Sequence, residues 1–507
     1  MNKVFLFTGK LYIDKGGGTN RVILNRSKSL IRQGYDVSIL TISDFNTKNV
    51  ETKLKKVGRL DDKVKHLNIY EYYKKINTIN GKSKMQIRYF NQGATLEDEN
   101  YHIEIDKPNF SAKYFKSGVY VKNKQWSKNG TLKYIDYYNN SNHTKIREKY
   151  HNTGYIQKIE YWNKDFKSQI QYFTIDGYCF LDVFFEEKNK KRKYHLYNRE
   201  SLSVKRFNNS EEFYTYWLNH MCSAQDSKPF LICDKITYAP SVINMEKNIA
   251  YRICSLHSNH LKSPYKVGSP KNPPHKIVLD NMDKLDSVVI LTNNQKEDII
   301  QEFGDYDNIS VIPHSVPNIP IIKAKKKKST VSLVARLAPV KRIQHSIIAF
   351  QQVVKQFPDA RLEIFGSGKL KSELKSKIKE LHLENNVFLK GYSQDTDLIY
   401  QSSLVTLLTS KSEAFALVIL ESMINGTPVI SYDINYGPND IITNKKDGYL
   451  IEENIDVLAN KIIKLLKKPR KAHKMGKRAR KNALHKFDEK LITSKWIELF
   501  NYLNNKS

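Results

Sequence analysis

Two glutamates eight residues apart, Glu413 and Glu421, have the spacing in this chain that most suggests chemistry. Before them, residues 404–408 are apolar and partly β-branched, as in a buried parallel strand, and residues 428–432 have the same character. The segment between must then be a crossover helix that begins at the carboxyl end of a strand, where open α/β sheets bind ligands. A helix N-terminus favours phosphate, and the two carboxylates could flank a sugar.

Arg336 and Lys341 form a second pair that could act on the same ligand. They lie five residues apart, directly after the strand pattern of residues 331–334. A guanidinium and an ammonium group in that place suit a diphosphate, whose negative charge they would stabilise as it departs. Taken alone, the pair is equally well explained as surface charge. In one domain with Glu413 and Glu421, in this order, it becomes a specific signal.

A run of three glycines offers a third candidate element. Gly16 and Gly17 belong to this run, which follows the strand pattern of residues 4–7 and precedes a helix pattern. Glycines let the backbone approach a ligand closely at the mouth of a helix. The run is not a G-x-G-x-x-G fingerprint, and a flexible turn is the alternative interpretation.

His257 follows the strand pattern of residues 250–256. A histidine that only caps a strand is one interpretation. Its expected position at the edge of the sheet, facing a cleft, favours a functional role instead. Asn259 and His260 are weaker candidates of the same kind.

The composition indicates several domains and an anionic partner. A chain of 507 residues is too long for one core, so two or three domains are expected. Lysine and arginine number 84 against 52 acidic residues, a net charge of +32. That excess suits nucleic acid, an anionic membrane or a polyphosphate polymer, with a solvated basic surface as the alternative. We find no basic recognition helix or aromatic RNA signature in the sequence, which argues against nucleic acid.

Cysteine spacing and hydropathy favour a cytoplasmic protein. The four cysteines show no C-x-x-C spacing, so we expect neither a disulfide framework nor a metal site. Residues 1–9 are too short for a signal peptide, and no apolar run approaches the roughly 20 residues that cross a bilayer. The basic cluster at residues 467–481 is either a peripheral contact with the inner membrane surface or a solvated helix face.

Residues 82–207 differ from the α/β sequence around them, because aromatic residues alternate with charged ones as in antiparallel strands. Residues 130–138, 154–162 and 177–185 resemble one another, and each begins with a glycine after a polar turn residue. We therefore predict an inserted meander of hairpins. Its face rich in Tyr and Lys could bind a long anionic chain or another subunit, and a scaffold sheet with aromatic cross-strand pairs is the alternative.

The α/β pattern resumes near Glu211, and a linker rich in Pro and Lys at residues 317–328 precedes a second α/β domain. With the two charged pairs described above, this order resembles the retaining glycosyltransferases of family 4, which have the GT-B fold. The similarity covers about the first 75 residues and everything from Glu211, and it is strongest over residues 331–450. Within the family, the chain is most similar to bacterial wall teichoic acid α-glycosyltransferases, which act on poly(ribitol-phosphate) or poly(glycerol-phosphate) and also carry a β-rich insertion.

The expected fold class is therefore α/β: two Rossmann-like domains that face a cleft, with a β-rich meander domain inserted in the N-terminal one. The predicted limits are residues 1–78 and 209–316 for the N-terminal acceptor domain, 79–208 for the insert, 317–480 for the nucleotide-sugar domain, and 481–507 for a helix that crosses back to the N-terminal domain.

The resemblance implies catalytic roles for four residues. Arg336 and Lys341 would hold the donor diphosphate, and Glu413 would bond hydroxyls of the donor sugar near the reacting carbon. His257 would contact the donor sugar or the acceptor near the point of transfer. With two cations at the diphosphate, transfer would need no metal ion. Retention would follow from attack on the face of the leaving group, with the donor phosphate helping to take the acceptor proton.

The resemblance also implies a set of residues that bind the donor nucleotide. Glu421 would hold the ribose hydroxyls, and Tyr392 would lie against the uracil. Three backbone amides at the helix N-terminus would face the distal phosphate, and two glycines would close onto the phosphates from the other domain. These amides and glycines are those of Phe415, Ala416, Leu417, Gly16 and Gly17.

The chain departs from the family pattern at two positions. The family usually has glycine after the first glutamate, where this chain has Ala414, and Ala416 takes the place of a second common glycine. A methyl group there could tighten the sugar pocket or change its choice of donor. No charged role is lost, so we still expect activity.

The leading hypothesis is a hexosyltransferase that moves glucose or N-acetylglucosamine from a UDP-sugar onto wall teichoic acid in α linkage, without a cofactor. The alternative is an enzyme that glycosylates serines of a serine-rich or Ser-Asp-repeat surface protein, which is also anionic. A third hypothesis is an inactive subunit that binds an adhesin, and the intact charged pairs argue against it. The family also implies a homo-oligomer, a trimer, built by the insert.

Overall fold

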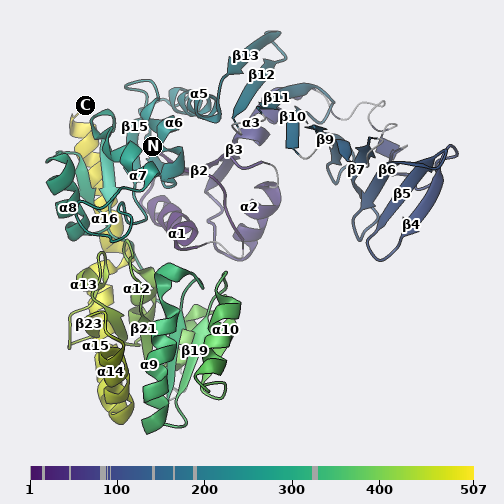
Figure 1. Cartoon of the computed structure of the whole chain (residues 1–507). Helices are drawn as coiled ribbons and strands as arrows, with labels where there is room; N and C mark the ends of the chain where they lie inside the picture. Colours follow the sequence, from purple (N-terminus) through teal and green to yellow (C-terminus); the bar gives the residue numbers. More distant parts are fainter. Residues whose placement is uncertain are drawn as a thin grey trace.

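The computed structural model places the part of the chain that it describes in three sheets with helices around them (Figure 1). The described residues are 2–13, 17–44, 47–79, 81, 87, 90, 91, 93–139, 143–163, 166–186, 191–321 and 329–506. Gly16 of the predicted donor site lies outside them. Two of the sheets are parallel and the third is antiparallel.

The first sheet, within the described residues, has the parallel order β17-β16-β15-β14-β1-β2-β3. Its strands are β1 (Lys3–Thr8), β2 (Asp36–Thr41), β3 (Lys65–Asn68), β14 (Phe230–Cys233), β15 (Tyr251–Ser255), β16 (Ser287–Ile290) and β17 (Ile309–Val311). Every residue of β1 is buried, as expected for a central strand covered on both faces. The strand order reverses between β1 and β14, so a ligand site is expected beyond the carboxyl ends of these two strands.

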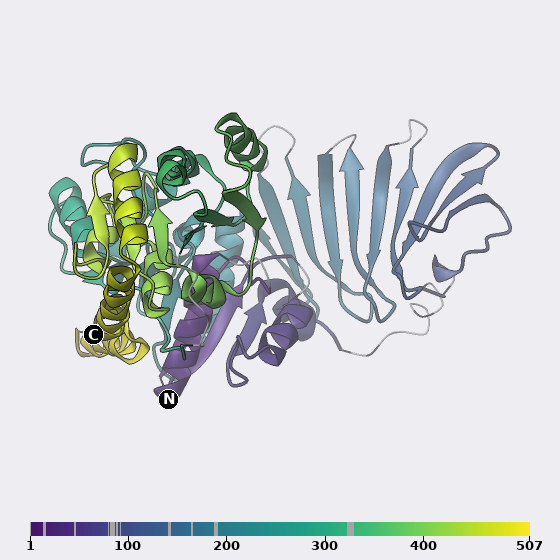
Figure 2. The ribbon, with the colours of Figure 1, turned by 90° about the horizontal axis from the view of Figure 1, so that it is seen from below.

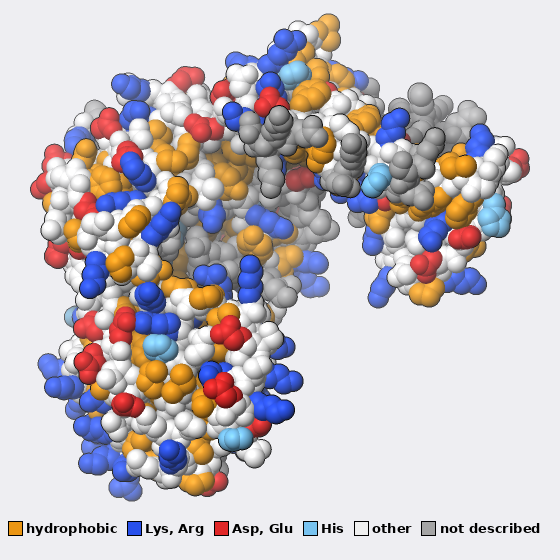
Figure 3. All heavy atoms as spheres, viewed as in Figure 1, with side chains coloured by type: hydrophobic (Ala, Val, Ile, Leu, Met, Phe, Trp, Pro, Cys, Tyr) orange, Lys and Arg blue, Asp and Glu red, His pale blue; other side chains and the backbone are white. Residues whose placement is uncertain are grey.

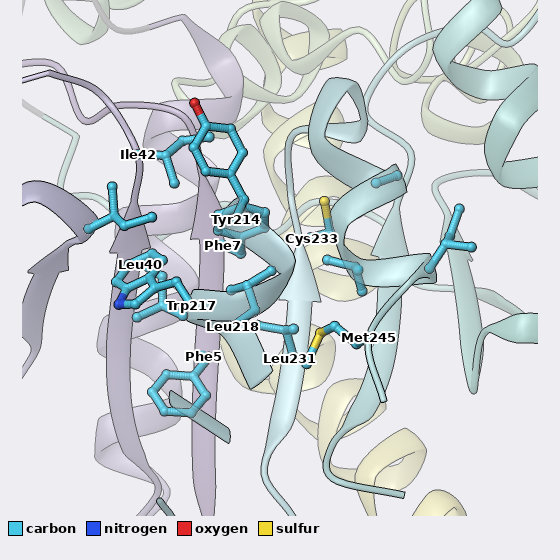
Figure 4. Packing of buried hydrophobic residues seen from close by; sticks show 14 of the residues in the cluster. Phe5, Phe7, Leu40, Ile42, Tyr214, Trp217, Leu218, Leu231, Cys233 and Met245 are labelled. Atoms are coloured by element: carbon cyan, nitrogen blue, oxygen red, sulfur yellow. The ribbon is translucent and has the colours of Figure 1, made fainter. Parts of the chain in front are cut away.

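Helix α5 (Ser210–Ser223) covers one face of the first sheet. Trp217 and Leu218 of this helix belong to the same buried cluster as Phe5 and Phe7 of β1. Figure 4 shows these side chains together, between the helix and the strands. Alternate residues of a strand point to one face, so Phe5 and Phe7 both pack on the α5 side of the sheet.

The C-terminal helix α16 (Glu489–Lys506) covers the other face. Val4 and Leu6, the alternate residues of β1, belong to a second cluster that includes Phe500 of α16. The rings of Phe230 and Phe500 stack with centroids 4.2 Å apart. The end of the chain is therefore part of the core of the first α/β domain.

Other helices connect the strands of the first sheet. They are α1 (Gly18–Arg32), α2 (Thr47–Lys56), α3 (Ile69–Ile76), α6 (Ala239–Ile243), α7 (Pro273–Leu279) and α8 (Asn293–Phe303). Asn68 caps α3 and Thr292 caps α8 through side-chain oxygens that accept from the backbone of the first turn.

The antiparallel sheet of the described chain runs from β4 to β13 with each strand beside its sequence neighbour. Its strands are β4 (His102–Asp106), β5 (Ser111–Lys116), β6 (Val119–Trp126), β7 (Leu132–Tyr138), β8 (Thr144–Tyr150), β9 (Ile156–Asn163), β10 (Phe166–Phe173), β11 (Cys179–Phe185), β12 (Arg192–Asn198) and β13 (Ser203–Phe207). Figure 2 shows these strands in a row that extends away from the α/β domains.

The three repeat glycines explain the hairpins of this sheet. Gly130, Gly154 and Gly177 lie in the turns before β7, β9 and β11 and have φ values of 75°, 81° and 87°. Only glycine adopts such values without strain. The structure therefore confirms the predicted inserted meander.

The third sheet has the parallel order β20-β19-β18-β21-β22-β23 in the described residues. Its strands are β18 (Thr330–Val334), β19 (Arg361–Phe365), β20 (Val387–Gly391), β21 (Val405–Leu408), β22 (Val429–Tyr432) and β23 (Tyr449–Ile451). Its helices are α9 (Ile343–Gln356), α10 (Lys371–Glu380), α11 (Thr396–Ser402), α12 (Leu417–Ile424), α13 (Pro438–Ile441), α14 (Ile455–Lys467) and α15 (Pro469–Phe487). Among the described residues, we find no helix with the length and apolar character that spanning a membrane requires.

Candidate active site

The charged pairs meet where the strand order of the third sheet reverses. β18 and β21 are neighbours at that point, and open α/β sheets bind ligands beyond such strand ends. Arg336 and Lys341 follow β18, and Glu413 follows β21. The fold thus brings together residues that are far apart in the sequence.

Lys341 and Glu413 are in direct contact. Lys341 ends a short 3-10 helix, and its ammonium group forms an ion pair with Oε1 of Glu413. The hydroxyl of Ser410 donates to the same oxygen at 2.6 Å. The side chains of Lys341 and Glu413 are only 16% and 13% exposed, so salt screens this pair much less than a surface pair.

Arg342 holds the loop that leads to Glu413, a role that the sequence did not reveal. Its guanidinium donates to the carbonyl oxygens of Thr409 and Ser410 at 3.1 and 2.9 Å. It also binds Glu453 through two contacts of 2.6 and 2.8 Å, and this bidentate bond lowers the pKa of Glu453. The signal in the sequence was a third cation beside Lys341.

Arg336 lies exposed on the loop after β18. The backbone on either side of it is hydrogen bonded at 3.0 Å to the end of β19 and to the loop after that strand. A Cβ at Gly366 would lie 1.8 Å from the carbonyl oxygen of Ala335, and one at Gly368 would lie 2.3 Å from that of Leu337. Glycine is therefore required at both positions for the loop of Arg336 to take this path.

Helix α12 begins directly after the loop of Glu413. Its N-cap is Ala416, whose backbone is left-handed, with φ 66° and ψ 59°. This conformation costs an L-residue with a side chain about 1 kcal/mol, so glycine would be less strained than alanine here. The first amides of a helix have no partner within the helix, so the segment from Phe415 to Leu417 offers donors at the edge of the sheet.

Glu421 lies one helical turn further into α12 and faces two other elements. Its Oε1 lies 2.7 Å from the guanidinium of Arg21 in α1, and its Oε2 accepts from the hydroxyl of Tyr400 in α11 at 3.2 Å. Burial raises the pKa of Glu421, and Arg21 opposes this rise. The contact with Arg21 joins the two α/β domains.

His257 follows β15 and is held by Asp234, which follows β14. The Nε2 of His257 donates to Oδ1 of Asp234 at 2.7 Å, and Arg26 donates to the same oxygen at 2.8 Å. Burial tends to raise the pKa of Asp234, but Arg26 and His257 outweigh it, so the pKa lies below its ordinary value. The ring of His257 stacks on His314 at 5.2 Å, and His314 meets Phe415 edge-on at 5.4 Å. The ring of His314 therefore lies between His257 and the segment that precedes α12.

Known proteins match this architecture. Residues 317–482 match the family described as glycosyl transferases group 1. A poly(ribitol-phosphate) alpha-N-acetylglucosaminyltransferase of Staphylococcus aureus (strain COL) is 30% identical over 99% of this chain and 100% of its own length. The chain belongs to the group 1 glycosyltransferases.

Two further relatives agree with this assignment. A poly(glycerol-phosphate) alpha-glucosyltransferase of Bacillus subtilis (strain 168) is 29% identical over 74% of this chain and 56% of its own length. The chain also matches the crystal structure of an S. aureus TarM mutant in complex with fondaparinux, alpha-GlcNAc-glycerol and UDP. The sequence identity is 28%, the match covers 99% of this chain and 100% of the TarM chain, and the TM-score is 0.88. The predicted GT-B fold and the predicted enzyme class are therefore confirmed.

The remaining predicted donor residues of this glycosyltransferase lie at the same edge or across from it. Tyr392 comes directly after β20, and 46% of its side chain is exposed. Gly17 is the N-cap of α1, and a Cβ added to it would meet nothing within 4 Å. A Cβ on Gly18 would lie 2.9 Å from Leu417, so the start of α1 packs against the start of α12.

The weaker candidates Asn259 and His260 lie at the contact between the two α/β domains. Asn259 donates to the hydroxyl of Ser412 at 2.9 Å in a buried bond. His260 stacks on Tyr436 with centroids 6.0 Å apart, and burial lowers the pKa of His260 to about 4. The hydroxyl of Tyr436 in turn donates to Asp298. Both candidates therefore support domain packing beside the Glu413 loop.

Asp234 and Arg21 are two residues of the site that the sequence analysis missed. Asp234 had a signal, since it is an acidic residue at the end of a strand in the same sheet as His257. Arg21 had none, because its partner Glu421 is 400 residues away and on the other domain.

Proposed function

We propose that this glycosyltransferase moves a hexose or an N-acetylhexosamine from a UDP-sugar onto the poly(polyol-phosphate) chain of wall teichoic acid, with retention and in α linkage. The observation that carries the proposal is the similarity to the S. aureus enzyme over 99% of the chain, because this similarity includes the ten-stranded sheet as well as both α/β domains. The two teichoic acid relatives carry different sugars in their names, so the donor is UDP-glucose or UDP-N-acetylglucosamine.

In this proposal the donor diphosphate lies beyond β18 and β21. Arg336 and Lys341 neutralise the charge that develops on the leaving UDP, as electrostatic catalysis requires. The N-terminus of α12 supplies amides and a positive partial charge for the distal phosphate. Because these groups supply positive charge, we propose that no metal ion is needed. The contact of Lys341 with Glu413 supports a site in which one cation serves both the phosphate and the sugar-binding carboxylate.

Retention follows from attack on the face that UDP leaves. The acceptor hydroxyl forms a bond to the anomeric carbon as the bond from that carbon to the UDP oxygen breaks, and the donor phosphate takes the proton. Glu413 positions the sugar through its hydroxyls. His257, oriented by Asp234, contacts the sugar or the acceptor.

The antiparallel sheet is the proposed binding surface for the anionic acceptor. Where it meets the first domain, the Nζ atoms of Lys149, Lys158 and Lys167 lie 3.0, 3.1 and 3.0 Å from Glu160. Lys158 also binds Asp44, so three cations face two carboxylates. Lys149 and Lys167 are about a third exposed and can exchange this contact for an acceptor phosphate.

The insert is also the proposed site of self-association, as a homotrimer. Removal of residues 79–208 should give a monomer that binds teichoic acid weakly, which light scattering and sedimentation with the polymer measure. A deletion variant that keeps the wild-type mass and the wild-type affinity for the polymer would make the sheet a passive scaffold.

Helix α15 is the proposed contact with an anionic membrane surface. Its exposed cations are Arg470, Lys471, Lys474, Lys477, Arg478, Lys481 and Lys486, and the helix contains no acidic residue. Figure 3 shows Lys and Arg side chains gathered over the end of the second α/β domain, where α14 and α15 lie. Each such cation contributes about 1 kcal/mol near an anionic leaflet. The wild-type protein should sediment with phosphatidylglycerol vesicles, and a variant with four of these residues changed to Glu should not.

Competition between acceptors tests the proposed function. Purified protein is incubated with UDP-glucose or UDP-N-acetylglucosamine in the presence of both teichoic acid and a serine-rich peptide. We expect the label on the polymer. Label on the peptide alone would instead support modification of a surface protein, and the proposal would fail.

A further inference from the structure

Arg21 occupies an unfavourable place in its own helix. It lies in the first turn of α1, and α1 has no acidic residue in that turn. The N-terminus of a helix carries a positive partial charge, so a cation there is destabilised by its own helix. The counter-charge comes from the second α/β domain, where Oε1 of Glu421 lies 2.7 Å from the guanidinium.

The same turn of α1 is packed against the start of α12. Gly18 lies close to Leu417, since an added Cβ would lie 2.9 Å from its Cδ1 atom. The ion pair and this close contact therefore fix the two helices to each other. The Glu421 side chain is 14% exposed, whereas that of Arg21 is 42% exposed, so the guanidinium reaches a carboxylate that is otherwise shielded from water.

Two other groups, both on α11, act on this carboxylate. Tyr400 of α11 donates to Oε2, and Asp397 of the same helix raises the pKa of Glu421 by its negative charge. Burial raises that pKa as well, and Arg21 opposes both effects.

We propose that Arg21 is a positioning residue for the nucleotide: reaching across from the first α/β domain, it holds Glu421 in the place and charge state that receive the ribose hydroxyls. This inference rests on the ribose-binding role of Glu421 in the proposed function. An ionised carboxylate has about four lone-pair sites, so Glu421 can keep Arg21 and Tyr400 while it accepts from the ribose. Nucleotide binding is then strongest when the two domains are in contact.

The test uses UDP alone, measured by calorimetry with the full-length protein. Arg21→Met should raise the Kd for UDP about tenfold, the size expected when a hydrogen bond to a charged group is lost. Arg21→Lys, which keeps the charge, should recover part of the affinity. Arg32→Met is the matched control, because Arg32 lies in the same helix and pairs with Glu489 at 2.9 Å, far from Glu421. The control should bind UDP as the wild type does.

A double-mutant cycle and a pH series separate positioning from a general loss of structure. In the Glu421→Gln background, Arg21→Met should have no further effect on the Kd. Without Arg21 the pKa of Glu421 should be higher still. As the pH is lowered, Glu421 should therefore become protonated, and UDP affinity should fall, at a higher pH in Arg21→Met than in the wild type. A variant that merely unfolded would show neither result, and the unfolding temperature is recorded for each protein.

The outcomes distinguish this inference from the proposed function. If Glu421→Gln binds UDP normally, the ribose role of Glu421 fails, and the inference fails with it. If Glu421→Gln weakens UDP but Arg21→Met does not, only the inference is overturned. Tighter binding of UDP by Arg21→Met would mean that Arg21 competes with the ribose, which also contradicts the inference.

Discussion

The ammonium group of Lys341 and the carboxylate of Glu413 form an ion pair although 72 residues separate them in the chain. The pair forms because β18 and β21 are neighbours, which places the segments after both strands at one edge of the sheet. The same edge carries the N-terminus of α12, and the other α/β domain approaches it through α1.

Removal of either charge of the pair should abolish most of the sugar transfer. Lys341→Ala and Glu413→Gln should each lower kcat by about 10²–10³-fold, the range seen when one preorganised group at a transition state is lost. Lys355→Ala, an exposed lysine at the far end of α9, should keep wild-type transfer. Incorporation of labelled sugar measures all three, and full activity of either site variant would contradict the assignment.

Ala416→Gly should stabilise the protein. Its left-handed backbone is strained for alanine and unstrained for glycine, so the free energy of unfolding should rise by about 1 kcal/mol. Ala479→Gly is the comparison, because Ala479 is buried inside α15, where glycine costs about 1 kcal/mol. Denaturant unfolding measures both changes: the free energy of unfolding should rise in Ala416→Gly and fall in Ala479→Gly. A lower stability for Ala416→Gly would show that the methyl group contributes packing that exceeds the strain.

Gly366→Ala should displace the loop of Arg336. The new Cβ would overlap the carbonyl oxygen of Ala335, so the fold should lose about 3 kcal/mol and the Kd for UDP should rise. Gly58→Ala is a comparison without the close contact, since Gly58 has φ 65° against 145° at Gly366 and nothing lies within 4 Å of an added Cβ. It should cost only about 1 kcal/mol. Equal losses in both variants would mean that the close contact is relieved easily.

Glu160 should make the protein sensitive to acid. Burial tends to raise the pKa of Glu160, but the surrounding lysines outweigh this and lower it to about 2. The pKa of a glutamate in the unfolded chain is about 4.3. The stabilisation by Glu160 is therefore complete above that pH and is lost as the pH falls towards about 2.

Glu160→Gln measures that contribution. The variant should unfold at a lower temperature than the wild type at pH 7, and the difference should shrink between about pH 4.3 and about pH 2. Glu104→Gln, on an exposed residue of β4, should match the wild type throughout. A difference for Glu160→Gln that stays constant with pH would exclude the lysine cluster as its origin.

Much of the site could be predicted because its residues follow recognisable strands. Buried apolar runs located β18 and β21, and the ends of those strands then located Lys341 and Glu413. The repeat glycines likewise predicted the hairpins of the insert. The rest of the site depends on contacts between distant segments, and the spacing of residues within one segment does not predict such contacts. Arg21 with Glu421 is one such contact, and Arg26 with Asp234, 208 residues apart, is another.

The anomeric configuration of the product shows whether this protein transfers the sugar to the polymer with retention. Poly(ribitol-phosphate) or poly(glycerol-phosphate) is incubated with the protein and with each UDP-sugar, and the purified polymer is examined by proton NMR. We expect an α-configured sugar on a polyol hydroxyl, and far less of it with Glu413→Gln over the same incubation. A β-configured sugar, or an unmodified polymer with both donors, would contradict this expectation.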